Sequence, residues 1–288
     1  MKKVVVLGAT GYVGSAITAS LSQRGREVRG LGRADVDIRR PETIAPALEG
    51  ADAIVHAAID ASPEAAEIDR RLVEWVLDRL EGSSTAFVYT SGAWVLGDTH
   101  GAVADESSAT DPPAIVAWRP SVERLVVDAG GWVIRPGIVY GGGGGLIGML
   151  FASARDEGAV RIVGDGRNHW PLVHREDLGD LYAKVIEERP DEHILHATDG
   201  TLFNVRRIAD ALSRAAGTRG RVLSTPLAHA RASLGPLADA LALDQRVSSA
   251  RARHSVGWSP RHRSIIAEAD DLWSSWELSS IGPTKRSA

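Results

Sequence analysis

The sequence predicts an α/β fold in which a doubly wound parallel β-sheet is followed by a smaller C-terminal α/β lobe. Short apolar runs alternate with stretches whose apolar residues recur every three or four positions, which is the pattern of strand-helix units on a parallel sheet. A glycine-rich turn also follows the first apolar run directly, where a helical stretch begins. A chain of 288 residues can bury such a core without disulfides or a structural metal.

A β-strand is expected where a short run rich in branched apolar residues is bounded by glycine or polar residues. The expected strands are Val4–Leu7, Glu27–Leu31, Ala53–His56, Ala86–Thr90 and Trp132–Arg135. Helical spacing of apolar side chains predicts the intervening helices around Val13–Leu21, Ile68–Leu80 and Val122–Ala129. Because glycine readily takes the left-handed conformation that closes a helix, helical stretches should end at Gly25, Gly50, Gly82 and Gly130.

Five consecutive glycines at positions 141–145 interrupt this pattern and predict a mobile loop, because glycine leaves the backbone with little restraint. Further elements are expected at Val160–Val163, Glu176–Glu188, His193–Ala197 and Val205–Ala216. The expected organisation is a first domain over residues 1–140, which a strand and a helix from the C-terminal part can join. A substrate-binding lobe over 141–278 and a flexible tail over 279–288 would follow.

The composition argues against several classes of protein. A formal net charge of −4 and a pI near 6.1 offer no basic footprint for nucleic acid. The absence of cysteine excludes disulfides, thiolate metal sites and cysteine nucleophiles. No apolar run approaches the roughly 18 residues that span a bilayer, so we expect no membrane partner and a cytoplasmic location. His193 and His196 would point to opposite faces of a strand, and no metal site is expected.

The glycine-rich turn has the pattern Gly-x-x-Gly-x-x-Gly and stands between an expected strand and an expected helix. The backbone there must turn tightly, approach a pyrophosphate closely and present free N–H groups at a helix N-terminus, which glycine allows. The turn therefore predicts a Rossmann-type domain that binds a dinucleotide. Its expected contacts are Gly8, Thr10, Gly11, Tyr12, Val13 and Gly14.

The end of the second strand usually decides which dinucleotide binds, because an acidic side chain there holds the ribose of NAD. Here the strand is followed by Arg33, which can pair with the 2′-phosphate of NADP. NADP(H) is therefore favoured over NAD(H), although Arg33 could also be a solvated loop residue. Asp37 is a candidate contact to the adenine.

Several further motifs follow in order along the chain. They are His56-Ala57-Ala58, Tyr89-Thr90-Ser91-Gly92-Ala93, Arg135-Pro136-Gly137-Ile138-Val139-Tyr140-Gly141, Leu172-Val173-His174-Arg175-Glu176-Asp177-Leu178 and Val256-Gly257-Trp258-Ser259-Pro260-Arg261-His262. Together with the glycine turn they resemble the extended and atypical short-chain dehydrogenase/reductases, the NAD-dependent epimerase/dehydratase family. The resemblance implies that Ala57, Ala58 and Thr90 line the cofactor and that Pro136, Gly137 and Val139 pass near the nicotinamide. It also implies a small-molecule substrate, and a monomer or a homodimer formed through the Ile68–Leu80 and Val122–Ala129 helices.

The catalytic set of that family is incomplete in this sequence. The family uses a serine, a tyrosine and a lysine four residues after the tyrosine, and no Tyr-x-x-x-Lys occurs here. The resemblance aligns Ile115 with the tyrosine, Arg119 with the lysine and Gly92, beside Ser91, with the serine. Arginine stays charged at any working pH and cannot relay a proton, but Arg119 can still hold the cofactor ribose.

Another group must then handle the proton if a hydride moves to or from a carbonyl. The candidates are His169, Ser91, Tyr140 and Asp60. His169 could instead form a hydrogen bond within its own lobe, and Asp60 could instead cap a helix. The leading hypothesis is an NADP-dependent oxidoreductase or epimerase acting on a small hydroxyl or carbonyl metabolite. The alternatives are a non-redox isomerase or cyclase on the same scaffold, and a non-enzymatic NADP(H) sensor.

Overall fold

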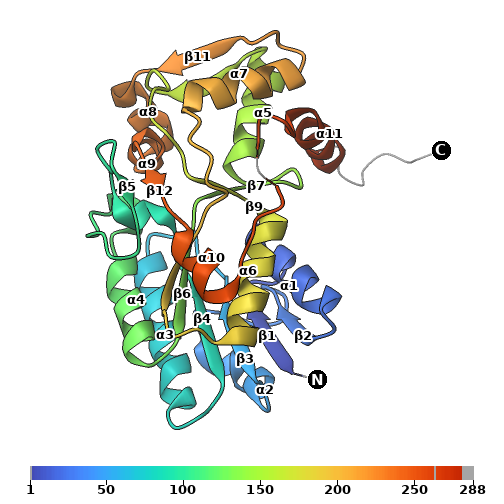
Figure 1. The fold of residues 1–288 in the computed structure, drawn as a ribbon, viewed down its shortest axis with the longest axis vertical. Coiled ribbons are helices and arrows are strands. Elements are labelled where there is room, and N and C mark those ends of the chain that lie inside the picture. Colours follow the sequence, from blue (N-terminus) through green and yellow to red (C-terminus); the bar gives the residue numbers. More distant parts are fainter. Residues whose placement is uncertain (1, 263, 281–288) are drawn as a thin grey trace, which may run out of the picture.

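Two lobes stacked along the long axis make up the molecule (Figure 1). The computed structural model describes residues 2–262 and 264–280. The lower lobe holds a parallel sheet with helices on both faces, and the upper lobe holds shorter strands and helices from the C-terminal half. This arrangement confirms the predicted α/β class.

The sheet of the lower lobe has six strands in the order β10-β6-β4-β3-β1-β2, all parallel. Its strands are β1 (Lys3–Leu7), β2 (Glu27–Leu31), β3 (Ala53–His56), β4 (Ala86–Thr90), β6 (Trp132–Pro136) and β10 (Ile194–Ala197). The order runs outward from β1 in both directions, so the sheet is doubly wound as predicted. Ligands of such sheets bind outside the carboxyl ends of the strands, near the point where the order reverses.

Helices cover both faces of this sheet. One face carries α1 (Tyr12–Gln23), α6 (Arg175–Glu188) and α10 (Ala250–Val256), and the other carries α3 (Ala65–Leu80) and α4 (Arg119–Asp128). The short helices η1 (Pro41–Ile44), α2 (Ala45–Leu48), η2 (Ala93–Leu96) and η3 (Ala114–Val116) lie in the connections. Within β1, Val4 and Val6 pack toward α1 and α6, while Val5 and Leu7 pack toward α3. Both faces are buried, which explains why the strand reads as a continuous apolar run.

Within the residues that the structure describes, the upper lobe is built from pairs of parallel strands and five helices. The pairs are β7 (Ile138–Tyr140) with β9 (Leu172–His174), β8 (Val160–Val163) with β11 (Val222–Thr225), and β5 (Val103–Ala104) with β12 (Arg246–Val247). The helices are α5 (Gly145–Glu157), α7 (Val205–Ala215), α8 (Leu227–Leu234), α9 (Leu237–Ala242) and α11 (Ala269–Ser280). A second apolar core, which includes Phe151, Ile208 and Trp276, lies among them.

The chain passes between the lobes repeatedly after residue 140. Helix α6 and strand β10 return to the lower lobe, where β10 pairs with β6 and becomes the edge of the sheet. Helix α10 returns later and packs beside α6, in the same apolar core as β10. The expected return of a strand and a helix to the first domain agrees with this path, and residues far beyond 140 complete the first core.

Two sequence-based expectations need correction. The sequence predicts a mobile loop at glycines 141–145; residues 141–144 do form a loop, but Gly145 already begins α5, and the ring of Tyr12 packs against Gly144 and Gly145. Ser279 and Ser280 were expected in a flexible tail, but they form the last turn of α11, because that helix packs its apolar face on the second core. The rest of the expected tail, residues 281–288, lies outside the described residues.

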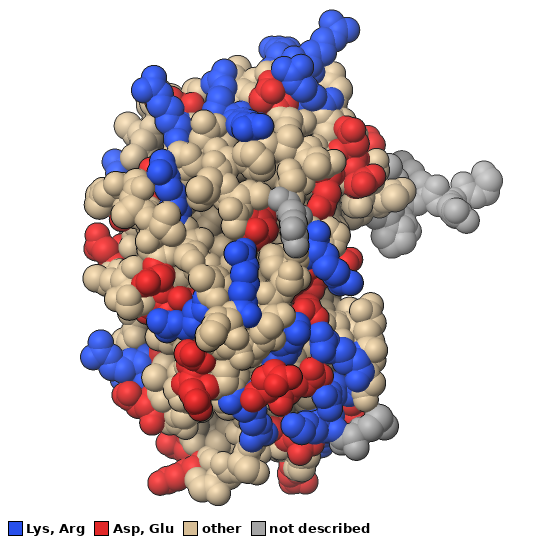
Figure 2. Space-filling view, in the orientation of Figure 1, with Lys and Arg blue, Asp and Glu red and all other residues tan. Residues whose placement is uncertain are grey.

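The surface carries charges of both signs. On the face shown in Figure 2, lysine and arginine side chains alternate with aspartate and glutamate over both lobes, and no large field of one sign is visible there. No helix within residues 2–262 and 264–280 is long and apolar enough to cross a membrane.

Candidate functional site

A crevice of about 920 Å³ opens at the carboxyl ends of β1, β2 and β3. Its lining includes these predicted cofactor contacts: Gly8, Thr10, Gly11, Tyr12, Val13, Arg33, Asp37, Ala57 and Ala58. The other predicted contacts are described residues outside this lining: Gly14, Thr90, Arg119, Pro136, Gly137 and Val139. The size of the crevice is within the range of small-molecule sites.

Two glycines of the turn are required by close packing. Gly8 has φ +83°, and a Cβ there would lie 2.6 Å from the backbone of Ala58. A Cβ on Gly14 would lie 2.1 Å from the carbonyl oxygen of Gly8. Side chains at either position would push β1, β3 and α1 apart, so these glycines bring the helix end and both strand ends to one point.

The N-terminus of α1 faces this point with free amides. Gly11 is the N-cap residue and has no side chain to cap the helix, and the first turn contains no acidic residue. The first amide that bonds within the helix is that of Ser15, which donates to the Gly11 carbonyl. The preceding amides and the positive end of the helix dipole suit the negative charge of a pyrophosphate.

Charged side chains at the far end of the crevice differ in their pairing. Arg39 forms an ion pair with Asp60 at 3.1 Å, and Asp37 pairs with Arg40 at 3.2 Å. Arg33 is exposed, lines the crevice and has no ionic partner among the described residues. It is therefore free to meet an anion without breaking a protein contact.

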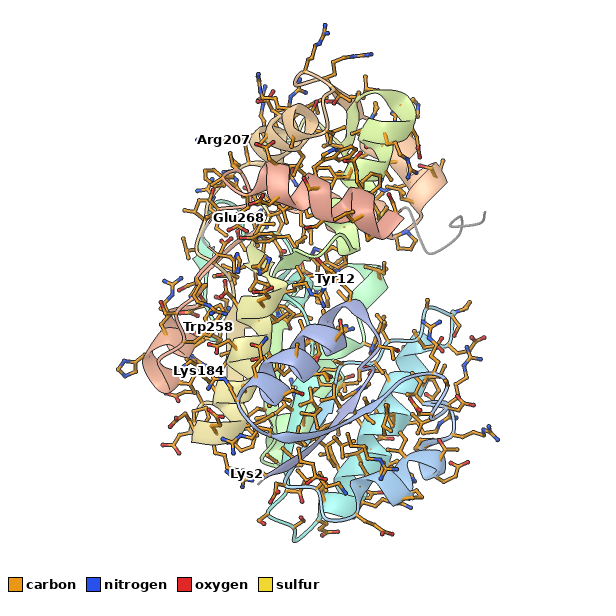
Figure 3. The ribbon with its side chains drawn as sticks, turned by 90° about the vertical axis from the view of Figure 1, so that its right-hand side faces the viewer. Lys2, Tyr12, Lys184, Arg207, Trp258 and Glu268 are labelled. Atoms are coloured by element: carbon orange, nitrogen blue, oxygen red, sulfur yellow. The ribbon has the colours of Figure 1, made fainter. Side chains whose placement is uncertain are left out.

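Tyr12 connects the glycine turn to the upper lobe. It lies at the start of α1, where that helix meets the upper lobe (Figure 3), and its hydroxyl donates to the carbonyl oxygen of Gly141 at 2.6 Å. The guanidinium of Arg175 lies 5.2 Å from the centre of the Tyr12 ring and donates to Ser15 Oγ at 2.7 Å. The sequence predicts Tyr12 only as a cofactor contact, because nothing local to it indicates a partner 129 residues away.

Side chains from α4 and α6 meet the carboxyl end of β4. Arg119 Nη1 donates to the Thr90 carbonyl at 2.6 Å, and Tyr182 donates its hydroxyl hydrogen to Thr90 Oγ1 at 2.6 Å. Ser91 is buried, and its Oγ has no hydrogen-bond partner among the described residues. Pro136 ends the adjacent strand β6, so this second group stands beside the crevice at the same edge of the sheet.

A buried carboxylate that the sequence analysis missed supports this region from behind. Asp69 on α3 accepts hydrogen bonds from His56 Nε2, the Tyr89 hydroxyl and Trp118 Nε1 at 2.9, 2.5 and 3.0 Å. Burial favours the neutral form of this carboxyl, but the hydrogen bond and charge of His56 and the charge of Arg119 lower its pKa to about 2. An acidic residue in a helix gives no sign in sequence of three partners on other elements.

The proton-handling candidates occupy very different surroundings. Tyr140 is fully buried in the second core, away from the crevice, so the structure argues against direct contact with a substrate. Asp60 lines the crevice, but its carboxylate is paired with Arg39 and accepts from the Ser62 amide at 2.8 Å. His169 Nδ1 donates to Asp244 Oδ1 at 2.7 Å, which is a hydrogen bond within its own lobe.

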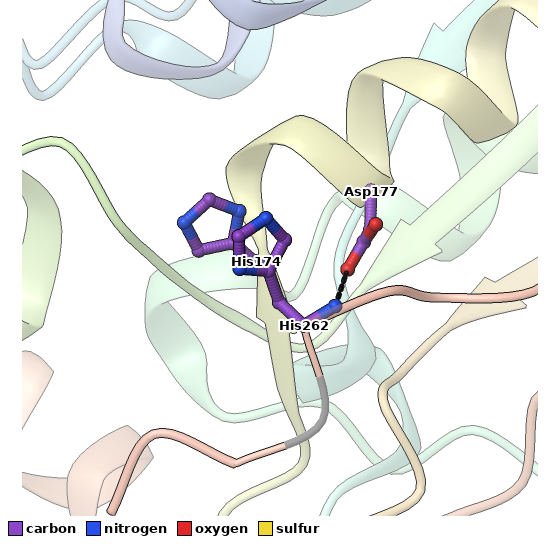
Figure 4. A group of neighbouring side chains, drawn as sticks. All are labelled: His174, Asp177 and His262. Carbon is purple, nitrogen blue, oxygen red and sulfur yellow. Dashed lines mark hydrogen bonds between the residues drawn. The ribbon is translucent and has the colours of Figure 1, made fainter. Parts of the chain in front are cut away.

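A compact cluster at the junction of the lobes contains His174, Asp177 and His262, the kinds of residue that bind metals (Figure 4). The two rings stack with centres 3.6 Å apart, and both carboxylate oxygens of Asp177 accept backbone amides, those of Arg261 and His262. His174 Nδ1 accepts the Glu176 amide and so caps α6. Because the Asp177 oxygens and His174 Nδ1 already have protein partners, the contacts of the cluster are those of a joint between the 261–262 segment and α6.

The fold, the glycine turn and the crevice define a dinucleotide-binding protein of the Rossmann class. Residues 4–197 match the NAD dependent epimerase/dehydratase family, and the chain belongs to that family. This confirms the resemblance found in the sequence motifs.

Individual relatives agree with this assignment. An uncharacterised protein of Schizosaccharomyces pombe is 27% identical over 290 residues, 92% of this chain and 97% of that protein. The epimerase family protein SDR39U1 of Homo sapiens is 26% identical over 245 residues, 75% of this chain and 81% of that protein. The crystal structure of human SDR39U1 with NADPH superposes with a TM-score of 0.80 at 23% identity, covering 94% of this chain and 99% of that one. The Thermus thermophilus UDP-glucose 4-epimerase complex with NAD gives 0.79 at 19% identity, covering 96% and 99%.

Proposed function

We propose that the protein is an NADP(H)-dependent oxidoreductase or epimerase that acts on a small hydroxyl or carbonyl metabolite. The crevice carries the proposal, because its close-packed glycines, free helix end and unpaired arginine suit the phosphates of NADP(H). A bound nicotinamide would supply or accept a hydride. The chain must then hold the dinucleotide and deliver or remove a proton at the substrate oxygen.

Arg33 supports NADP(H) over NAD(H). It stands just beyond β2, where an acidic residue would be expected in an NAD-binding protein, and it has no ionic partner among the described residues. The NADPH bound in the structure of human SDR39U1 agrees with this choice. We expect Arg33 to pair with the 2′-phosphate.

His169 and Asp244 are the pair that we propose for proton transfer. Asp244 fixes the tautomer of His169 by accepting from Nδ1, and Nε2 has no hydrogen-bond partner among the described residues. Burial raises the pKa of Asp244, but the hydrogen bonds from His169 lower it more, so the group is a carboxylate that can accept from Nδ1. Gln245 donates to the carbonyls of Ala93 and Gly97 at 2.8 Å, which joins this segment to η2, just after Ser91.

The cofactor proposal is tested by titrating NADPH and NADH into the protein and following fluorescence. Arg33→Ala should weaken NADPH binding by about 10- to 100-fold and NADH binding much less, since a charge-assisted contact to phosphate is lost. Arg231→Ala removes an exposed arginine paired with Asp239 in the upper lobe and serves as the control. Equal losses for both cofactors in Arg33→Ala would contradict the preference for NADP(H).

The catalytic proposal is tested by following absorbance of the reduced cofactor with a panel of carbonyl substrates. His169→Ala should reduce turnover by roughly 10²- to 10⁴-fold while leaving the Kd for NADPH unchanged. Asp244→Asn should also reduce turnover and shift its pH profile, because the imidazole loses its orienting carboxylate. Full activity of His169→Ala would eliminate this histidine as the proton donor.

A second function is favoured by the residues at the family's tyrosine and lysine positions. Ile115 cannot transfer a proton, and Arg119 is hydrogen-bonded to the Thr90 carbonyl. These features suit a non-redox isomerase or cyclase, or an NADP(H) sensor. Tight NADPH binding without oxidation across a broad carbonyl panel would favour this second function, and product analysis would then separate an enzyme from a sensor.

A further inference from the structure

Two loops face each other across one end of the crevice, one after β2 and one after β3. Arg39 on the first loop donates from Nε and Nη2 to the two carboxylate oxygens of Asp60 on the second, at 3.1 and 3.3 Å. Both residues line the crevice. The ion pair therefore spans the opening and joins its two rims.

Both partners are held in place by other contacts. The Arg39 amide donates to Asp37 Oδ1 at 3.0 Å, and the Arg39 carbonyl accepts from Arg71 on α3 at 2.7 Å. Asp60 accepts the Ser62 amide at 2.8 Å, and its side chain is only 15% exposed. Because the carboxylate grips the edge of the guanidinium through two bonds, the plane of that group has a defined orientation before any ligand binds.

The surface beside this ion pair is unusually apolar for an open rim. Ile59 is 61% exposed although it is a large aliphatic residue, and Ala58, Val36 and Ile38 line the same crevice. A flat apolar ring placed there would cover Ile59 and could stack on a face of the Arg39 guanidinium, since Asp60 occupies only its edge. A purine base has that shape and that chemistry.

Charge separates the roles of the two crevice arginines. The charge of Arg39 is neutralised by Asp60, whereas Arg33 has no ionic partner among the described residues. A neutralised guanidinium still offers a planar face to a base, but it offers little net attraction to a phosphate dianion. Arg39 is thus suited to contact the adenine, which NADPH and NADH share.

We infer that Arg39, held by Asp60, forms a wall of the adenine subsite, and that Asp60 is a positioning residue for dinucleotide binding. The inference rests on the proposed dinucleotide function. It assigns Asp60 to binding through Arg39 in place of the proton transfer that its position in the sequence had suggested.

The test compares Arg39→Ala, Asp60→Asn and the double variant in titrations with NADPH, NADH and 2′,5′-ADP. Each single change should raise the Kd for all three ligands by a similar factor, on the order of fivefold. The double variant should lose no more than the worse single variant, because both changes disrupt one unit. Arg231→Ala, which removes an arginine of similar exposure from an ion pair outside the crevice, should change none of these Kd values.

The outcomes separate this inference from the proposed function. Failure of the wild-type protein to bind NADPH or NADH would remove the proposed function itself. Normal binding by wild type together with unchanged binding by Arg39→Ala would overturn only the adenine wall. A loss confined to NADPH and 2′,5′-ADP would also overturn it, since Arg39 would then contact the 2′-phosphate. Additive losses in the double variant would show that Asp60 does not act through Arg39.

Discussion

Asp199→Asn should stabilise the protein relative to wild type increasingly as the pH rises. Asp199 follows β10 and is only 7% exposed. Its Oδ1 accepts the amide and the hydroxyl of Thr201 at 2.8 and 2.7 Å, and Oδ2 is buried. Burial raises the pKa of this carboxyl from 3.8 to about 6, and the nearby Asp177 adds to the effect.

The sign and size of the effect follow from this raised pKa. The folded state holds the Asp199 proton more tightly than the unfolded state does, so its contribution to stability is complete below pH 3.8 and is lost as the pH rises through 6. The full loss is about 3 kcal/mol, of which roughly 1.4 kcal/mol falls between pH 5 and pH 8. Asparagine keeps the acceptor for Thr201 and carries no charge, so the variant escapes this loss.

Urea denaturation of both proteins at pH 5 and pH 8 measures the difference. The free energy of unfolding of Asp199→Asn minus that of wild type should be about 1.4 kcal/mol larger at pH 8 than at pH 5, because other titrating groups cancel in the subtraction. Asp128→Asn, at the exposed end of α4, controls for the general effect of removing a carboxylate. A difference that is the same at both pH values would refute the assignment of Asp199 as a buried carboxyl that resists ionisation.

Three further variants test the packing of the lower lobe. Gly8→Ala should lose about 2–4 kcal/mol of stability in urea melts and abolish NADPH binding, because its Cβ would meet the Ala58 backbone. Gly130 also has a positive φ but faces open space, so Gly130→Ala should lose only about 1 kcal/mol and bind NADPH normally. Glu123→Ala should lower the free energy of unfolding by about 3–5 kcal/mol, because it leaves the buried guanidinium of Arg135 without its ionic partner. A smaller loss would mean that water reaches that charge. Burial lowers the pKa of His196 to about 3, so the free energy of unfolding should fall as the pH drops from 6.5 toward 3. His196→Gln should flatten this acid dependence, and an unchanged pH profile in the variant would contradict the lowered pKa.

The elements of the first half could be predicted because their causes are local. The expected strands Glu27–Leu31, Ala53–His56 and Ala86–Thr90 agree with β2, β3 and β4 residue for residue. Short apolar runs and the glycines that end helices act within a few positions, and Gly25 and Gly130 take the expected positive φ. The glycine turn was equally clear, since Gly8 and Gly14 are required by contacts inside one strand-helix unit and its neighbour.

The parts of the site that could not be predicted depend on pairs of residues far apart in the chain. Arg39 and Asp60 lie on separate loops, and His169 and Asp244 are 75 residues apart. The motif that contains Tyr140 predicts where this residue lies along the chain, but not which face of β7 its side chain occupies. In the structure the Tyr140 side chain is buried. Loop conformation and side-chain direction arise from tertiary packing, which periodicity and spacing do not encode.

The return of β10 to the sheet of the lower lobe constrains how this protein can be divided or synthesised. A fragment ending at residue 140 would lack β10, and β6 would become an open edge with unpaired amides and carbonyls. It would also lack α6 and α10, which together with α1 cover one face of the sheet. The apolar core of the lower lobe includes Trp258, so this core is complete only after the chain has been synthesised to about that residue.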